Sequence, residues 1–130
     1  MSLDVSIVKT NDKGECLDTI WWGNVTHNMN MMADHVPIKY SDEEGMVSFM
    51  GSLYDVVWNL KEIGDGYFVD TTNMGKALSL GICYMIEHRL ELLQYNPRNG
   101  FGDFNAFLIF LIDYKNNCED NPGCRIEISK

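Results

Sequence analysis

The 130-residue sequence predicts an α+β domain in which a small antiparallel sheet, made of an N-terminal hairpin and a C-terminal strand, packs against about four helices. Three observations support this fold class. Segments that alternate polar and apolar residues lie at both ends of the chain, and helical patterns fill the space between them. The composition, 45% hydrophobic and 22% charged, is that of a globular protein, and 14.9 kDa corresponds to one domain spanning residues 1–130.

The two ends of the chain supply the predicted sheet. Residues 4–8 alternate, residues 11–14 have turn chemistry, and residues 19–22 are β-branched or aromatic, so residues 3–24 predict a β-hairpin. Residues 125–128 alternate again after a turn. Because a terminal strand without a partner is unstable, we expect it to join the hairpin in one antiparallel sheet.

Two helices are predicted in the first half of the chain. Thr26 is a suitable N-cap for a short helix that ends before Pro37. Residues 41–44 match a capping box, and behind them apolar residues recur at spacings of three and four from Met46 to Leu60. This spacing predicts an amphipathic helix that ends near Gly64.

Two further helices are predicted in the second half. Residues 77–93 are apolar on more than one side, and we expect Cys83 within them to be buried. Residues 106–112, behind an N-cap at Asp103, are apolar all round. Such a helix is either central in the domain or forms a contact between copies of the chain, and we favour the central position.

The charge is acidic and uneven. The chain has 10 basic and 19 acidic residues, a formal charge of −9, and residues 1–65 hold 4 of the basic and 11 of the acidic ones. No basic cluster suits a nucleic-acid backbone and no apolar run of 18 residues suits a membrane, so we expect neither as a direct partner. An acidic half steers basic partners, or simply keeps a small protein soluble.

No sequence motif indicates catalysis or a cofactor. A phosphate-binding loop, a dinucleotide-binding glycine motif, a nucleophile elbow and a zinc-protease motif are all absent, and the three histidines lack metal-ligand spacing. We therefore expect no cofactor and no metal, assign no catalytic residue, and favour a binding protein over an enzyme. The four cysteines contain no C-x-x-C pair and no signal peptide precedes them, which indicates a reduced, cytoplasmic protein.

Two groups of residues are candidates for binding. Trp21 and Trp22 are adjacent, so on a strand they point to opposite faces, and one of them must lie outside the core. An exposed tryptophan is a common interface anchor, and we predict a protein-binding surface formed by Trp21 or Trp22 together with the acidic run Asp42, Glu43 and Glu44. His27 and Asn28 form a second, polar corner that suits a small-molecule pocket.

Three segments carry a resemblance to known proteins. They are Asn24-Val25-Thr26-His27-Asn28-Met29 with Met32-Ala33, the Asn-Pro-x-Asn-Gly-aromatic-Gly stretch at 96–102, and the segment from Cys118 through Asn121-Pro122 to the terminal strand, at 118–129. Together they resemble a family of small phage, prophage and bacterial proteins that has no assigned activity. The chain departs from the family at residues 36–40, where a Trp-x-Pro-Glu-like loop is expected. The resemblance implies a shared fold and a mobile-element origin, and it implies no function.

These observations lead to one leading hypothesis and two alternatives. The leading hypothesis is a small acidic protein that binds another protein stoichiometrically, such as an anti-CRISPR-like inhibitor of a host defence or regulatory factor. The first alternative is a small-molecule-binding protein or minor enzyme with a pocket near His27 and Asn28, although we favour a structural, helix-capping role for residues 26–28. The second alternative is an accessory protein that self-associates into a homo-oligomer through the 106–112 helix.

Overall fold

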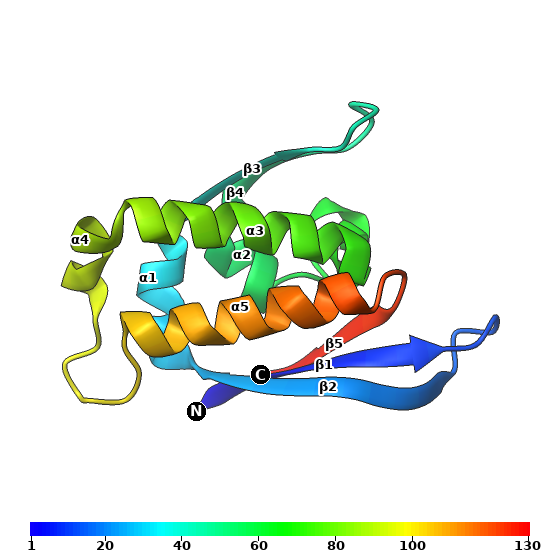
Figure 1. The fold of residues 1–130 in the computed structure, drawn as a ribbon, viewed down its shortest axis with the longest axis horizontal. Coiled ribbons are helices and arrows are strands. Elements are labelled where there is room, and N and C mark those ends of the chain that lie inside the picture. The colour runs from blue at the N-terminus through cyan, green and yellow to red at the C-terminus, as the bar shows by residue number, and fades with distance from the viewer.

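The computed structural model describes all residues, 1–130, and has an α+β architecture (Figure 1). With 3₁₀ turns labelled η, the elements follow in the order β1 (Ser2–Thr10), β2 (Cys16–Thr26), η1 (His27–Met29), α1 (Asn30–Asp34), β3 (Pro37–Ser41), β4 (Ser48–Ser52), α2 (Leu53–Trp58), η2 (Gly64–Val69), α3 (Thr71–Glu87), α4 (Arg89–Leu92), η3 (Leu93–Tyr95), α5 (Phe104–Asp120) and β5 (Arg125–Ser129). None of the helices combines the length and the apolar character needed to cross a membrane.

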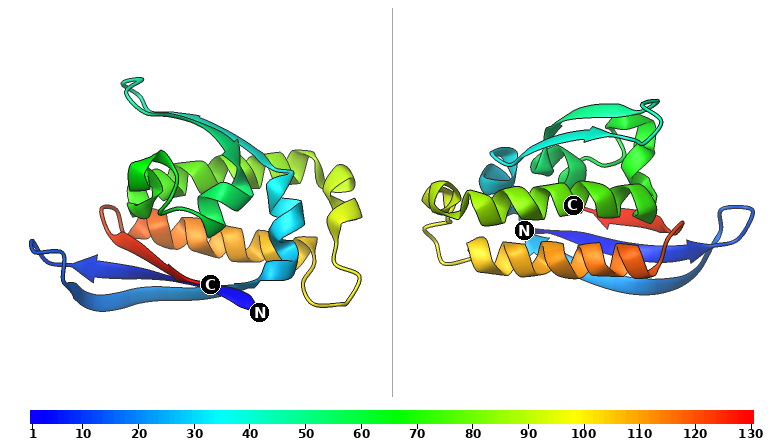
Figure 2. Two further views of the ribbon diagram at one scale, coloured as in Figure 1. Left: turned by 180° about the vertical axis from the view of Figure 1, so that it is seen from behind. Right: turned by 45° about the horizontal axis from the view of Figure 1, so that its top comes forward.

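The predicted sheet is confirmed, and it is built from both ends of the chain. It has the order β2-β1-β5 with both pairs antiparallel, and the two termini lie close together (Figure 1). On one face the side chains of Leu3, Val5 and Ile7 are fully buried, and Ile7 lies between Trp21 on β2 and Ile126 on β5. Helix α5 covers this inner face and α3 packs on α5, whereas the outer face carries no helix (Figure 2).

The predicted helix over residues 46–60 is wrong in its first half. Residues 37–52 form a β-hairpin of β3 and β4, and a helix, α2, begins only at Leu53. The hairpin forms because Asp42 closes its tip. Its backbone N–H donates to the carbonyl oxygen of Val47 (3.0 Å), and its carboxylate accepts from the backbone N–H of Val47 (3.2 Å), while Gly45 takes a left-handed φ of +71°. The capping box predicted at residues 41–44 is therefore wrong, because these residues lie at the hairpin tip; the capping box at the start of α2 joins Ser52 to Asp55.

Helix α5 lies between the sheet and α3, as expected for a central helix, but one edge of it is open to solvent. Its buried side chains include Phe107 and Tyr114, which belong to the core shared with Trp58 and Phe68. Ile109 is nevertheless 67% exposed. Cys83 on α3 is also exposed, contrary to the prediction that it is buried.

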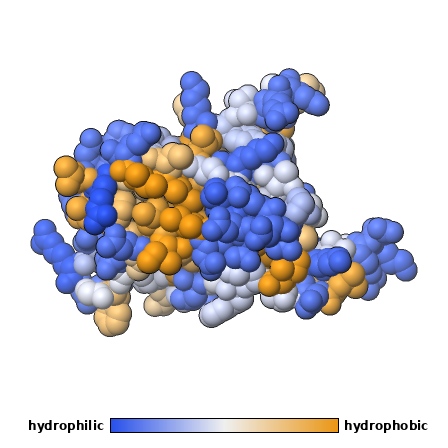
Figure 3. Space-filling view, viewed as in Figure 1, coloured by the Kyte–Doolittle hydropathy of each residue, from blue (hydrophilic) through white to orange (hydrophobic).

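An apolar surface patch covers parts of α3 and α5. Figure 3 shows apolar side chains gathered over these two helices, on the face of the molecule between the β3–β4 hairpin and the three-stranded sheet. The large hydrophobic side chains exposed on the two helices are Leu80, Ile86, Ile109 and Ile112. This patch is a surface through which two copies of the chain could associate, as the self-association alternative requires. It includes residues of α3 as well as the 106–112 segment of α5 on which that alternative was based.

Candidate functional site

The turn from β2 into η1 is closed by Thr26, which has the predicted capping role. Its backbone is extended, and its hydroxyl oxygen accepts a hydrogen bond from the backbone N–H of Asn28 at 3.3 Å. This bond satisfies one of the donors that the first turn of a helix leaves free. Thr26 thereby fixes where His27 and Asn28 emerge from the sheet.

His27 accepts a hydrogen bond from a buried tryptophan. The indole N–H of Trp58 donates to Nδ1 of His27 at 2.9 Å, and Trp58 itself is only 2% exposed. Because an indole nitrogen can only donate, Nδ1 must be unprotonated, and the neutral imidazole carries its proton on Nε2. Trp58 also stacks on Tyr54, with ring centroids 5.5 Å apart, so the ring of His27 is anchored to α2.

The loop that precedes α5 folds back onto the same turn. The side-chain amide of Asn28 donates to the carbonyl oxygen of Phe101 at 3.3 Å, and Asn96 accepts a hydrogen bond from the backbone N–H of Phe104 at 2.9 Å. Gly102, at φ +94°, packs so tightly that a Cβ there would lie 2.7 Å from Cγ2 of Thr26. Two of the three segments on which the expected resemblance rests therefore lie against each other.

The third segment lies at the opposite end of α5 and holds the C-terminal turn to α3. The hydroxyl of the fully buried Thr71 donates to the carbonyl oxygen of Asn121 at 2.5 Å and accepts from the backbone N–H of Cys124 at 3.0 Å. Burial raises the pKa of the nearby Cys118 thiol to about 12, and it raises the pKa of Tyr114 well above its usual value. These contacts explain residues 118–129 as structural elements.

A polar groove opens between the His27 turn and the loop before α5. We call it the amide groove; its volume is about 600 Å³. The residues lining it are His27, Asn28, Asn30, Met31, Gln94, Tyr95, Asn96, Pro97, Arg98 and Asn99. The predicted pocket at His27 and Asn28 thus corresponds to a groove, and six of its residues come from the 94–99 loop region, which sequence reasoning did not connect to it.

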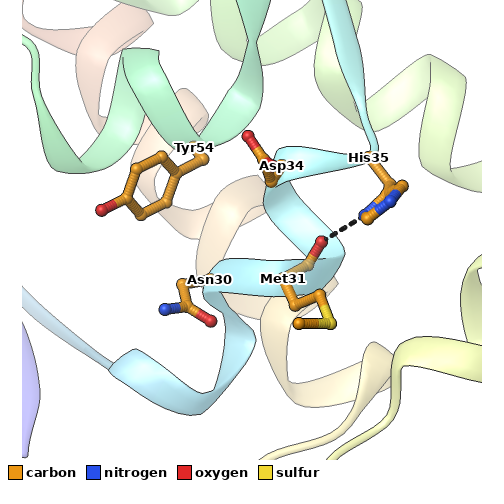
Figure 4. A pocket seen from close by; sticks show the side chains of 5 residues that line it. All are labelled: Asn30, Met31, Asp34, His35 and Tyr54. Atoms are coloured by element: carbon orange, nitrogen blue, oxygen red, sulfur yellow. Dashed lines mark hydrogen bonds between the residues drawn. The ribbon is translucent and has the colours of Figure 1, made fainter.

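A smaller pocket of about 260 Å³ adjoins the amide groove at Asn30 and Met31. Figure 4 shows Tyr54, Asn30 and Asp34 around one side of the α1 helix, while His35 points to the other side. Nδ1 of His35 lies 2.8 Å from the carbonyl oxygen of Met31, and its ring stacks on Tyr95 with centroids 4.0 Å apart. The ring of His35 is therefore engaged by neighbouring residues of the chain, through this hydrogen bond and this stacking contact.

Trp21 and Trp22 take opposite sides of the sheet, as predicted. Trp21 is half-buried on the inner face, stacks on Tyr114 (centroids 5.2 Å apart) and donates from its indole N–H to Asp113 at 3.0 Å. Trp22 is 63% exposed and pairs with Ser6 in the sheet register, which places it on the open outer face. Of the two tryptophans, Trp22 is the one available to a partner.

The acidic run lies far from Trp22. It forms the tip of the β3–β4 hairpin, which projects from the side of the molecule opposite the three-stranded sheet (Figures 1 and 2). Glu43 and Glu44 are exposed there, whereas Asp42 is half-buried and holds the turn. The structure therefore does not bring the predicted aromatic and acidic residues together into one contact surface.

Comparison with protein-family models, with curated proteins and with solved structures finds no match to this chain. No group of three or more His, Cys, Asp or Glu side chains is arranged to hold a metal ion. A function for this chain therefore has to be inferred from its own sequence and geometry.

Proposed function

We propose that this chain is a small protein-binding protein that acts stoichiometrically, with Trp22 as the anchor of the contact. The observation that carries the proposal is the 63% exposure of Trp22 on a sheet face that no helix covers. Tryptophan is enriched among the residues that dominate binding energy, because a partner can desolvate its large apolar surface completely.

Two further hydrophobic side chains of strand β2 are exposed. β2 is an edge strand, and Leu17 (59% exposed) and Ile20 are also open to solvent along it. Both lie at the positions where the register with β1 shifts, so both belong to bulges. Bulges disfavour the addition of another strand to an edge. We therefore propose a partner that covers the outer face of the sheet.

The acidic hairpin tip has a separate role in this proposal. Glu43 and Glu44 contribute to the −9 charge of the chain, and charges raise the association rate without touching the partner. Because opposite charges attract, the partner in this proposal carries basic residues on the surface that approaches the hairpin tip. The resemblance to phage and prophage proteins favours a host defence or regulatory factor, which this chain would inhibit in an anti-CRISPR-like manner. The exposed free thiols of Cys16 and Cys83 suit the reducing cytoplasm.

The test is affinity capture from a host lysate at low and moderate salt, with three baits. These are the natural chain, Trp22→Ser, and the control Phe101→Ser, which removes an aromatic side chain of similar exposure from a different surface. We expect the natural chain and the control to retain one partner near one-to-one stoichiometry. Trp22→Ser should weaken the purified complex by about 30-fold or more, which is the threshold of an interface hot spot.

Two results would contradict the proposal. The first is equal affinity of Trp22→Ser and Phe101→Ser for the captured partner. The second is a capture that retains no protein at either salt concentration. In that case light scattering on the purified chain would show whether the apolar patch over α3 and α5 pairs two copies instead.

A further inference from the structure

The amide groove differs in charge from the protein that surrounds it. None of its ten lining residues is acidic, and one of them, Arg98, is basic. The guanidinium of Arg98 is exposed and takes part in none of the three ion pairs of the chain. In a chain with 19 acidic residues, this groove therefore keeps a cation that no carboxylate neutralises.

The groove also has unused hydrogen-bond donors. The side-chain oxygens of Asn96 and Asn99 are engaged by the backbone N–H groups of Phe104 (2.9 Å) and Phe101 (3.0 Å). The NH₂ group of each carboxamide is consequently left without a partner in the chain. His27 adds its Nε2–H, because Nδ1 is engaged by Trp58. In Asn96, Asn99 and His27, a hydrogen bond to one side-chain atom thus leaves an N–H donor of the same side chain without a partner in the chain.

We propose that the amide groove binds a small organic anion through a carboxylate or phosphate group. Carboxylates and phosphates accept hydrogen bonds, and four donors of the lining are free to serve them: two NH₂ groups, an imidazole N–H and a guanidinium. Tyr95 and Pro97 provide apolar surface for the body of the ligand, and a volume of about 600 Å³ accommodates a small metabolite. This site is independent of the protein-binding surface at Trp22.

The test uses three probes that share one ring: benzoate, phenyl phosphate and the neutral benzyl alcohol. Amide resonances of the folded, isotope-labelled chain are followed by NMR during titration with each probe. We expect at least one of the two anions to shift resonances of residues 26–31 and 94–99 in a saturable way, and benzyl alcohol to leave them unchanged. Which anion binds more tightly identifies the carboxylate or the phosphate as the preferred group.

Three variants test the assignment of the residues. Arg98→Gln should weaken anion binding about tenfold or more, because it removes a charge-assisted hydrogen bond. Asn99→Asp keeps the oxygen that accepts from Phe101 but places a carboxylate in the groove, so it should abolish binding. Lys61→Gln removes an exposed cation that does not line the groove and should bind like the natural chain.

The proposal is overturned if neither anion shifts the groove resonances, or if benzyl alcohol shifts them equally. It is also overturned if Arg98→Gln and Lys61→Gln bind alike, since the anion would then respond only to the overall charge. Arg98 is exposed and makes no ion pair, so its replacement should leave the folded spectrum intact.

Discussion

The hydrogen bond between Trp58 and His27 should make a measurable contribution to stability, and a double-mutant cycle isolates it. His27→Ala leaves the indole N–H of Trp58 without its acceptor at 2.9 Å in a site where the ring is 2% exposed. An unsatisfied buried donor costs about 1–3 kcal/mol. Trp58→Phe removes the donor and part of the packing volume, which together should lower the free energy of unfolding by about 2–3 kcal/mol.

The double variant should be less destabilised than the sum of the single variants. Once Trp58→Phe has removed the donor, His27→Ala no longer leaves an N–H unsatisfied, so we expect a coupling energy of about 1–2 kcal/mol. Urea unfolding followed by far-UV circular dichroism measures it, because this signal does not depend on the tryptophan that is replaced.

His35→Ala is the matched control for this cycle. His35 stacks on Tyr95 and bonds Met31, and it has no contact with Trp58 among its hydrogen bonds and ring pairs. Its coupling to Trp58→Phe should therefore lie near zero. The reasoning is refuted if the effects of His27→Ala and Trp58→Phe add to within about 0.3 kcal/mol, the usual range for independent sites.

Three further predictions concern stability. Gly102→Ala should lower the free energy of unfolding by about 2 kcal/mol or more, because φ is +94° and a Cβ would lie 2.7 Å from Thr26. Gly100→Ala, at φ +79° with open space around it, should lower it by about 1 kcal/mol. Equal losses for the two variants in urea unfolding would contradict the close approach at Gly102. Thr71→Val keeps the shape of the buried side chain but leaves the Asn121 carbonyl and the Cys124 N–H without partners, so it should lower the free energy of unfolding by about 2 kcal/mol in the same assay. A loss below about 0.5 kcal/mol would contradict the role of the hydroxyl. Burial raises the pKa of the Cys118 thiol from 9.0 to about 12, so the unfolded chain loses this proton first and stability should fall as pH rises above 9, by at most about 1.4 kcal/mol per pH unit. A pH series of urea unfolding in which Cys118→Ala has the same slope between pH 9 and 10 as the natural chain would rule out this origin.

The sheet could be predicted from the sequence because its signals are local. Alternation at residues 4–8 and 125–128 reports which face of each strand is buried, and the register confirms it, with Ile7 opposite Ile126. The 37–52 hairpin could not be predicted because its apolar residues satisfy helical spacing by coincidence. Met46 and Met50, which defined that helical face, are 80% and 77% exposed. The tip interactions of Asp42 and Gly45 outweigh the helical period there.

The site was predictable only in part, for a similar reason. His27 and Asn28 stand out in the sequence because polar residues directly follow a strand, and Thr26 precedes them as a cap. Their partners lie 31 and 73 positions away, at Trp58 and Phe101, and no local period connects residues at such distances. A tryptophan with an indole N–H to satisfy was the one available signal, since a buried Trp58 requires an acceptor from elsewhere in the chain.

The separation of Trp22 from the acidic tip has a kinetic consequence for the proposed protein complex. Trp22 acts only when its ring is desolvated by the partner, so its replacement should raise the dissociation rate. Glu43 and Glu44 act on the approaching partner through the electric field, so Glu43→Gln with Glu44→Gln should lower the association rate and flatten its dependence on salt. Asp42 must be kept in this experiment, because its carboxylate holds the hairpin tip. If the glutamate variants instead change only the dissociation rate, the tip touches the partner, and the partner must then reach both the outer face of the sheet and the β3–β4 hairpin.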